Sequence, residues 1–197
     1  MDTIRYRQAT IDDAPFVALV VIEALGNSLM ERRVAGNETP EDQHLQNQIE
    51  DVCRRPDTLY SWKNTRMAIS SQGEPIGAIV AYPGEGYLEC RNRTFNMLSN
   101  LITFDVASMD AETQDGEYYL DSLAVHPHWR GKGIARQLIT QAQQEAEQMG
   151  RPAILACAPD NTGARKLYES LGFRLEGHMY IFGEDYLRMV SSSVTSS

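Results

Sequence analysis

Hydrophobic and polar positions in the first half of the chain predict one strand, two helices and a β-hairpin. The predicted elements are an edge strand over 4–9, a helix beginning at Thr10, a helix over 40–54, and a hairpin of strands 66–71 and 75–82. Thr10 suits an N-cap because Asp13 follows three residues later, which is capping-box spacing. Gly73 lies in the hairpin turn and can adopt the positive φ angle that such turns use.

The second half has a clearer pattern. It predicts a strand over 118–125, a helix over 134–149, a strand over 153–158 and a helix over 161–171. Ala164, Leu167, Tyr168 and Leu171 form an apolar stripe at helical spacing in the last of these. Two strands joined by a crossover helix run parallel, so this order predicts an α/β or α+β fold with a parallel pair in a mixed sheet.

Residues 83–116 break this pattern and are predicted to be a loop-rich insertion within a single domain, 1–190. A Ser-rich tail, 191–197, is predicted to be disordered. The insertion and the strand after it hold a run of acidic residues from Asp105 to Asp121. This run is either a solvated surface or a surface that attracts a cation, and in the second case neutralising Asp110, Glu112 and Asp115 raises the KM of a cationic substrate at low salt.

Composition and charge mainly exclude classes of function. The 197 residues carry a formal net charge of -9, which argues against coating a nucleic acid, because that needs an excess of Lys and Arg. The apolar run 16–22 is much shorter than the roughly 20 residues that span a bilayer, so no membrane association is predicted. Cys53, Cys90 and Cys157 form no CxxC pair, so we expect reduced thiols, no metal site and a cytoplasmic location.

A candidate anion-binding loop lies between the strand 118–125 and the helix that follows it. Residues 130–135, R-G-K-G-I-A, place two glycines and two basic residues where a helix begins and its first N–H groups lack partners. Such a loop suits a phosphate or pyrophosphate, although a tight turn with solvated basic residues has the same pattern. Two nucleotide motifs fit less well, because no Ser or Thr follows Lys132 as in a Walker loop and Arg136 replaces the last glycine of a dinucleotide fingerprint.

Two segments together resemble a known family. L-A-V-H-P-H-W-R-G-K-G-I-A over 123–135 is similar to the acetyl-CoA loop of the GCN5-related N-acetyltransferases (GNAT), and N-T-G-A-R-K-L-Y-E-S-L-G-F over 161–173 is similar to their N-x-x-A-x-x-x-Y-x-x-x-G-F helix. The resemblance implies a mixed, mostly antiparallel sheet whose central parallel pair splays at an acetyl-CoA cleft, with helices on both faces. It also implies transfer of an acetyl group to an amine.

The resemblance further implies roles for individual residues. Cofactor contacts are carried over to Leu123, Ala124, Val125, Arg130, Gly131, Lys132, Gly133, Ile134, Ala135, Asn161, Ala164 and Tyr168. Residues 130–135 would hold the pyrophosphate, and main-chain groups at Leu123 and Val125, freed by a bulge, would bind the pantetheine arm. Tyr168 would be the general acid that protonates the departing thiolate. Local sequence leaves Asn161 open as a simple N-cap and Tyr168 open as a core tyrosine.

The acceptor amine must lose a proton before it attacks, so a base is needed. Asp121 and Glu117 are the candidates, because they are four residues apart on one strand and face the same side as Tyr119. Either carboxylate is alternatively structural or solvated. We therefore expect an enzyme that acetylates a primary amine of a small molecule or peptide in a ternary complex, with a homodimer as one assembly and Cys157 as an inert core thiol. The alternatives are a catalytically silent acyl-CoA-binding or regulatory module and a different nucleotide-phosphate enzyme.

Overall fold

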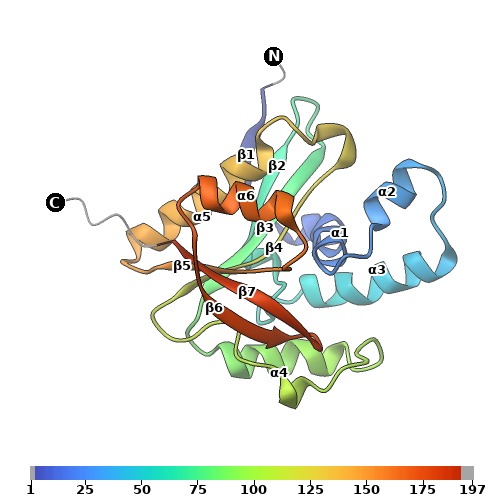
Figure 1. Cartoon of the computed structure of the whole chain (residues 1–197). Helices are drawn as coiled ribbons and strands as arrows, with labels where there is room; N and C mark the ends of the chain where they lie inside the picture. The colour runs from blue at the N-terminus through green and yellow to red at the C-terminus, as the bar shows by residue number, and fades with distance from the viewer. Residues whose placement is uncertain (1–2, 192–197) are drawn as a thin grey trace. The chain divides into compact units, whose positions relative to one another are not determined.

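A computed structural model describes residues 3–191 (Figure 1). The strands are β1 (Arg5–Gln8), β2 (Thr65–Ile69), β3 (Pro75–Pro83), β4 (Tyr118–Val125), β5 (Ala153–Cys157), β6 (Arg174–Ile181) and β7 (Glu184–Ser191). The helices are α1 (Ala14–Ala24), α2 (Leu29–Val34), α3 (Pro40–Cys53), α4 (Tyr87–Met97), α5 (Ile134–Gln148) and α6 (Thr162–Ser170). Every helix and strand predicted from the pattern is confirmed, with bounds that shift by a few residues.

The strands form one mixed sheet in the order β1-β2-β3-β4-β5-β7-β6. β4 and β5 are the predicted parallel pair, and β1–β2, β2–β3, β5–β7 and β6–β7 are antiparallel. The ladder between β4 and β5 joins Tyr118–Leu120 to Ala153–Leu155, whereas β5 continues to pair with β7 as far as Cys157. The ladder between β5 and its antiparallel partner is therefore longer than the ladder between β5 and its parallel partner.

The chain folds as two compact units. The first comprises the chain up to Ala81 together with Ser122–Leu138, and the second comprises Tyr82–Asp121 and the chain from Ile139 onward. In the first unit the apolar helix α1 packs against α3 (Figure 1). Thr39 caps α3 by accepting a hydrogen bond from the Asp42 N–H at 3.2 Å. Thr10 precedes a turn of 3₁₀ helix that leads into α1. Its N–H donates to the Asp13 carboxylate at 2.7 Å.

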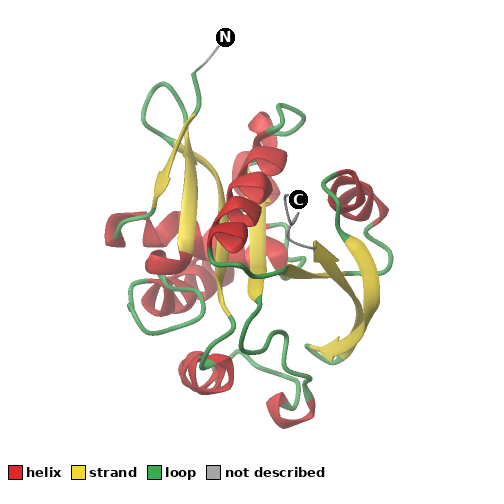
Figure 2. Cartoon of the chain, turned by 90° about the vertical axis from the view of Figure 1, so that its left-hand side faces the viewer, coloured by secondary structure: helices red, strands yellow, loops and turns green. Residues whose placement is uncertain are grey.

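The second unit contains the β6–β7 hairpin, which Figure 2 shows as a long curved pair of strands. Its turn places both Phe182 and Gly183 at positive φ, 56° and 83°. Two positive φ angles in a row are typical of the tight turns that match the twist of a hairpin. The Phe182 ring contacts Phe95 on α4 and Phe104, with centroids 6.3 Å and 5.5 Å apart. These contacts compensate the strain of a non-glycine residue in the left-handed region.

Four parts of the chain differ from the sequence prediction or were not predicted. Residues 83–116 are not only loop, because they contain α4, whose buried face includes Arg91 and Thr94 and so lacks an apolar stripe. The short helix α2 and the strands β6 and β7 were not predicted. Of the predicted disordered tail, Ser191 ends β7 and residues 192–197 lie outside the described residues. Between residues 3 and 191, no helix has the length and apolar character that crossing a membrane requires.

Candidate active site

The first unit contains the predicted anion loop at the start of α5. Gly131 and Gly133 have φ angles of 74° and 79°, a region that side chains with a Cβ rarely occupy. Among residues 3–191, the backbone N–H groups from Gly131 to Ala135 donate no hydrogen bond, whereas the Gln137 N–H donates to the Gly133 carbonyl at 3.0 Å. Five free donors at the positive end of a 15-residue helix form a strong anion site.

The two basic side chains of this loop differ in what they contact. The Arg130 guanidinium forms an ion pair with Glu31 on α2, lies 3.7 Å from Glu23 on α1, and donates from Nε to the Val125 carbonyl at 3.0 Å. Lys132 Nζ stands 4.2 Å from the centre of the Trp129 ring and its residue is exposed. The Arg130 charge is therefore partly compensated within the protein, and the backbone donors with Lys132 are the groups best placed to take an anion.

Other cofactor-binding predictions in the first unit involve β4 and α5. Leu123 is partly exposed, whereas Ala124, Val125 and Ile134 are buried. A bulge at Leu123 and Val125 stays a prediction. Close packing surrounds this strand end, because a Cβ at Gly77 on β3 would lie 3.2 Å from the Ala124 carbonyl oxygen.

The second unit contains the other predicted cofactor motif, residues 161–173. Asn161 is the N-cap of α6, and its Oδ1 accepts a hydrogen bond from the Ala164 N–H at 3.1 Å. The capping role left open by the sequence is therefore present. Asn161 is also exposed, and its contact with a cofactor stays a prediction.

Tyr168 lies on α6 with its ring against Phe173, 6.0 Å between centroids. Its hydroxyl forms no hydrogen bond among residues 3–191. Burial, and secondarily Cys157, raise the pKa of this hydroxyl to about 12, so it remains protonated at neutral pH. An unpaired, protonated phenol next to a cofactor-binding motif is suited to donate a proton to a leaving thiolate.

Cys157 is 3% exposed, and burial raises the pKa of its thiol. A buried, protonated thiol is a poor nucleophile, which agrees with the prediction of an inert core cysteine. Among the residues that the structure describes, no group of three or more His, Cys, Asp or Glu side chains is arranged to hold a metal ion.

Glu117, one of the two predicted bases, precedes β4 and is buried in an ion pair. Its Oε1 lies 2.5 Å from the Arg188 guanidinium on β7, and Oε2 accepts from the Thr113 hydroxyl and the Gln114 N–H, both at 3.1 Å. Arg188 also pairs with Glu176 at 2.7 Å. These contacts match the structural alternative for Glu117, since both oxygens are already occupied by donors.

We predict that Glu117→Ala lowers the free energy of unfolding by about 3 kcal/mol, because it leaves the Arg188 charge half-buried without its closest partner. Urea unfolding of the purified variant measures this loss. Arg165→Ala is the control, because it removes an exposed pair with Glu169 within α6 and should cost at most about 0.5 kcal/mol. Equal losses in the two variants would contradict a structural role for Glu117.

Asp121, the other predicted base, is a half-buried residue on β4 whose Oδ2 accepts a hydrogen bond from the Tyr82 hydroxyl at 2.5 Å. A second carboxylate of the same unit is Glu112, which the sequence did not single out as a candidate base. Glu112 is 3% exposed and accepts from the hydroxyls of Tyr87 at 2.7 Å and Tyr119 at 2.8 Å. Nothing in the local sequence distinguishes Glu112, because its partners come from α4 and β4.

The acidic run therefore is not one uniform solvated surface. Glu112 and Glu117 are buried, and Asp110 is exposed but accepts from the Tyr180 N–H at 2.7 Å. Asp115 is exposed and Asp105 begins a short 3₁₀ turn. A KM effect from neutralising Glu112 would consequently not report on surface charge, because that side chain is buried among tyrosines.

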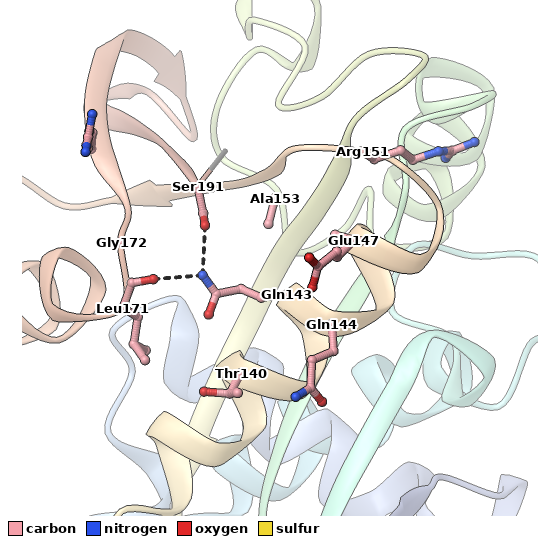
Figure 3. A pocket seen from close by; sticks show the side chains of 11 residues that line it. Thr140, Gln143, Gln144, Glu147, Arg151, Ala153, Leu171, Gly172 and Ser191 are labelled. Carbon is pink, nitrogen blue, oxygen red and sulfur yellow. Dashed lines mark hydrogen bonds between the residues drawn. The ribbon is translucent and has the colours of Figure 1, made fainter. Parts of the chain in front are cut away.

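A cavity of about 540 Å³ in the second unit contains none of the predicted site residues (Figure 3). It lies beside the second half of α5, where Gln143 donates to the Leu171 carbonyl at 2.9 Å and to the Ser191 hydroxyl at 2.8 Å. A second cavity, of about 420 Å³, is lined by residues at the start of α4 and by Ala111, Thr113 and Gln114. The second cavity therefore borders the segment that carries Glu112.

Comparison with known proteins identifies relatives of this chain. Residues 23–173 match the family described as Acetyltransferase (GNAT) family. A stretch of 64 residues is 42% identical to GCN5-related N-acetyltransferase 4, chloroplastic, from Arabidopsis thaliana, and this match covers 32% of the chain but only 22% of that protein.

Solved structures of acetyltransferases match over nearly the whole chain. One crystal structure of an acetyltransferase is 27% identical with a TM-score of 0.71, covering 96% of this chain and 99% of that one. An N-acetyltransferase from Staphylococcus aureus Mu50 has the same fold, with 21% identity, a TM-score of 0.75, and coverage of 94% and 99%. Because the family match spans most of the chain and the seven-stranded mixed sheet agrees with it, the protein belongs to the GNAT family.

Proposed function

We propose that this protein transfers the acetyl group of acetyl-CoA to a primary amine of a small molecule or peptide, by direct attack of the amine in a ternary complex. The observation that carries the proposal is the row of free N–H groups from Gly131 to Ala135 at the start of α5. A pyrophosphate needs several fixed donors at once, and a helix start with two glycines supplies them without a metal.

The roles of the site residues follow from their chemistry. Backbone groups of 131–135, with Lys132, hold the pyrophosphate, while Leu123, Val125 and Asn161 contact the rest of the cofactor. Acetyl-CoA supplies an activated thioester, which an amine attacks without help from a covalent enzyme intermediate. Asp121 takes the proton from the ammonium form of the acceptor, and Tyr168 gives its proton to the thiolate that leaves. The buried Cys157 thiol supports direct attack, because it is unsuited to carry the acetyl group.

The proposal also covers the acceptor-binding segment, the cellular location and the oligomeric state of the protein. The segment 83–116, which contains α4, contributes to recognition of the amine, because variable walls of this kind determine acceptor choice. The protein works in the cytoplasm, which is supported by three free cysteines. A homodimer is the assembly to test first, by light scattering.

Calorimetry with acetyl-CoA and a thiol-release assay test the proposal together. The assay uses an alkylamine, an aryl-alkylamine and a peptide with one lysine as acceptors. We expect acetyl-CoA to bind at one site per chain and at least one amine to release CoA. Binding of acetyl-CoA without CoA release from any amine would favour the silent acyl-CoA-binding module. Displacement of acetyl-CoA by ATP or NAD would instead favour a nucleotide enzyme.

A further inference from the structure

Glu112 is a carboxylate held in the interior of the second unit by two tyrosines. The Tyr87 hydroxyl on α4 donates to Oε1 at 2.7 Å, and the Tyr119 hydroxyl on β4 donates to Oε2 at 2.8 Å. Within residues 3–191, no Lys, Arg or His side chain forms an ion pair with it. A buried carboxylate with hydroxyl partners only is costly to ionise, because hydroxyls compensate a charge less well than a cation does.

A second carboxylate lies on the same network of tyrosines. Asp121 accepts from the Tyr82 hydroxyl at 2.5 Å, and the Tyr82 ring contacts the Tyr119 ring with centroids 5.9 Å apart. Burial, followed by the negative charge of Asp121, raises the pKa of Glu112 to about 7. Two carboxylates that interact in this way titrate as a pair, so the charge of one changes the proton affinity of the other.

The titratable and charged groups that face Glu112 come from four elements. They are Tyr87 and Arg91 on α4, Tyr119 and Asp121 on β4, Tyr82 in β3, and Tyr186 and Arg188 on β7. Neither arginine forms an ion pair with the Glu112 carboxylate. Arg91 donates to the Asp110 carbonyl at 3.0 Å, and Arg188 pairs with Glu117 and Glu176 and reaches Glu112 at its main-chain carbonyl, at 3.4 Å. Asp121 is therefore the charged side chain that most directly opposes ionisation of Glu112.

A cavity borders the residues around Glu112. Tyr87, which donates to Glu112, lines the cavity of about 420 Å³, and so do Ala111 and Thr113 on either side of Glu112 in the chain. Because the Glu112 side chain itself is buried, a proton that it exchanged with solvent would have to pass through a neighbouring cavity of this kind.

We propose that Glu112 is a positioning residue for the acetyl transfer, which sets how strongly Asp121 binds a proton. This inference rests on the proposed function. In the step concerned, an N–H bond of the acceptor ammonium breaks, an O–H bond on Asp121 forms, and the lone pair left on nitrogen attacks the thioester. When Glu112 is ionised its charge raises the proton affinity of Asp121, and when Glu112 is protonated Asp121 becomes a weaker base.

The sign of the pH dependence follows. Glu112 loses its proton as pH rises through about 7, so Asp121 becomes more basic and kcat rises over the same range. We expect Glu112→Gln to abolish this limb and to lower kcat at pH 8 by about tenfold, to the plateau that the wild type has at low pH. The measurement is the pH profile of kcat, by thiol release, with whichever of the three amines is acetylated.

Two further variants test whether the rising limb of the kcat–pH profile comes from Glu112. Tyr87→Phe removes a hydrogen bond that stabilises ionised Glu112, so the limb should move to higher pH. Glu145→Gln is the matched control, because Glu145 on α5 also accepts from a tyrosine hydroxyl, that of Tyr118 on β4 at 2.7 Å, and neither Glu112 nor Asp121 is its partner. The rising limb of the kcat–pH profile should stay unchanged in Glu145→Gln. A Glu112→Gln enzyme that keeps the limb would overturn the proposal.

A titration that needs no acceptor separates this inference from the proposed function. Carbon-13 NMR of the side-chain carboxyls, with the Glu112 signal assigned by its loss in Glu112→Gln, gives the protonation midpoint of Glu112 in the intact protein. We expect a midpoint near 7 in the wild type and one lower by about a pH unit in Asp121→Asn. An unchanged midpoint in Asp121→Asn would refute the coupling. If no amine is acetylated while the midpoint still falls, the proposed function fails and the coupling stands.

Discussion

Tyr168→Phe is expected to lower kcat by about 100-fold or more, while the Kd of acetyl-CoA changes by no more than about twofold. The substitution removes one hydroxyl that has no hydrogen bond among the described residues, so the fold loses little. Without this group the thiolate leaves unprotonated, which raises the barrier of that step. Steady-state kinetics by thiol release and calorimetry with acetyl-CoA separate the two effects.

Tyr180→Phe is the control for this experiment. Tyr180 lies on β6 in the same unit and its side chain is 40% exposed, so its hydroxyl should be dispensable. The full pH profile of Tyr168→Phe adds a second readout, because loss of a general acid also removes a limb at high pH. Turnover by Tyr168→Phe at the wild-type rate would reject Tyr168 as the acid and leave it as a core tyrosine packed on Phe173.

Gly133→Ala is expected to weaken acetyl-CoA binding by tenfold or more. The φ angle of 79° at this position is one that L residues occupy at a cost of roughly 1 to 2 kcal/mol, and relief of that strain turns the adjacent N–H groups away from the anion. A tenfold increase in Kd corresponds to about 1.4 kcal/mol. Calorimetry with acetyl-CoA measures it, and thermal unfolding measures the cost to the fold.

Gly150→Ala provides the matched control at the other end of α5. Gly150 has a φ angle of 68°, and, as at Gly133, a Cβ there would meet no atom within 4 Å. Both variants should therefore lose a similar amount of thermal stability, but only Gly133→Ala should lose acetyl-CoA affinity. Equal Kd values in the two variants would show that the loop from Gly131 to Ala135 does not hold the pyrophosphate.

Prediction from sequence succeeded where the signal is local. The strand β4, the helices α5 and α6 and the glycines of the anion loop depend on side-chain periodicity, capping and φ preference, all of which act within a few residues. α4 was missed because its buried face carries polar residues that find partners elsewhere in the chain. Arg91 is the example, since it donates to the Asp110 carbonyl 19 residues away.

The residues of the candidate site likewise divide into those that local sequence predicted and those that only the tertiary structure revealed. The sequence alone predicted the anion loop, Asn161, Tyr168 and Asp121 as site residues, because each belongs to a motif or to a strand face that can be counted along the chain. Only the tertiary structure revealed that Glu117 is paired with Arg188, 71 residues distant, that Arg130 contacts Glu31, and that Glu112 lies buried between tyrosines of α4 and β4. A carboxylate in the sequence has no environment of its own: burial and the charges around it determine whether it is solvated, structural or a regulator of a base, and folding brings those groups together from distant parts of the chain.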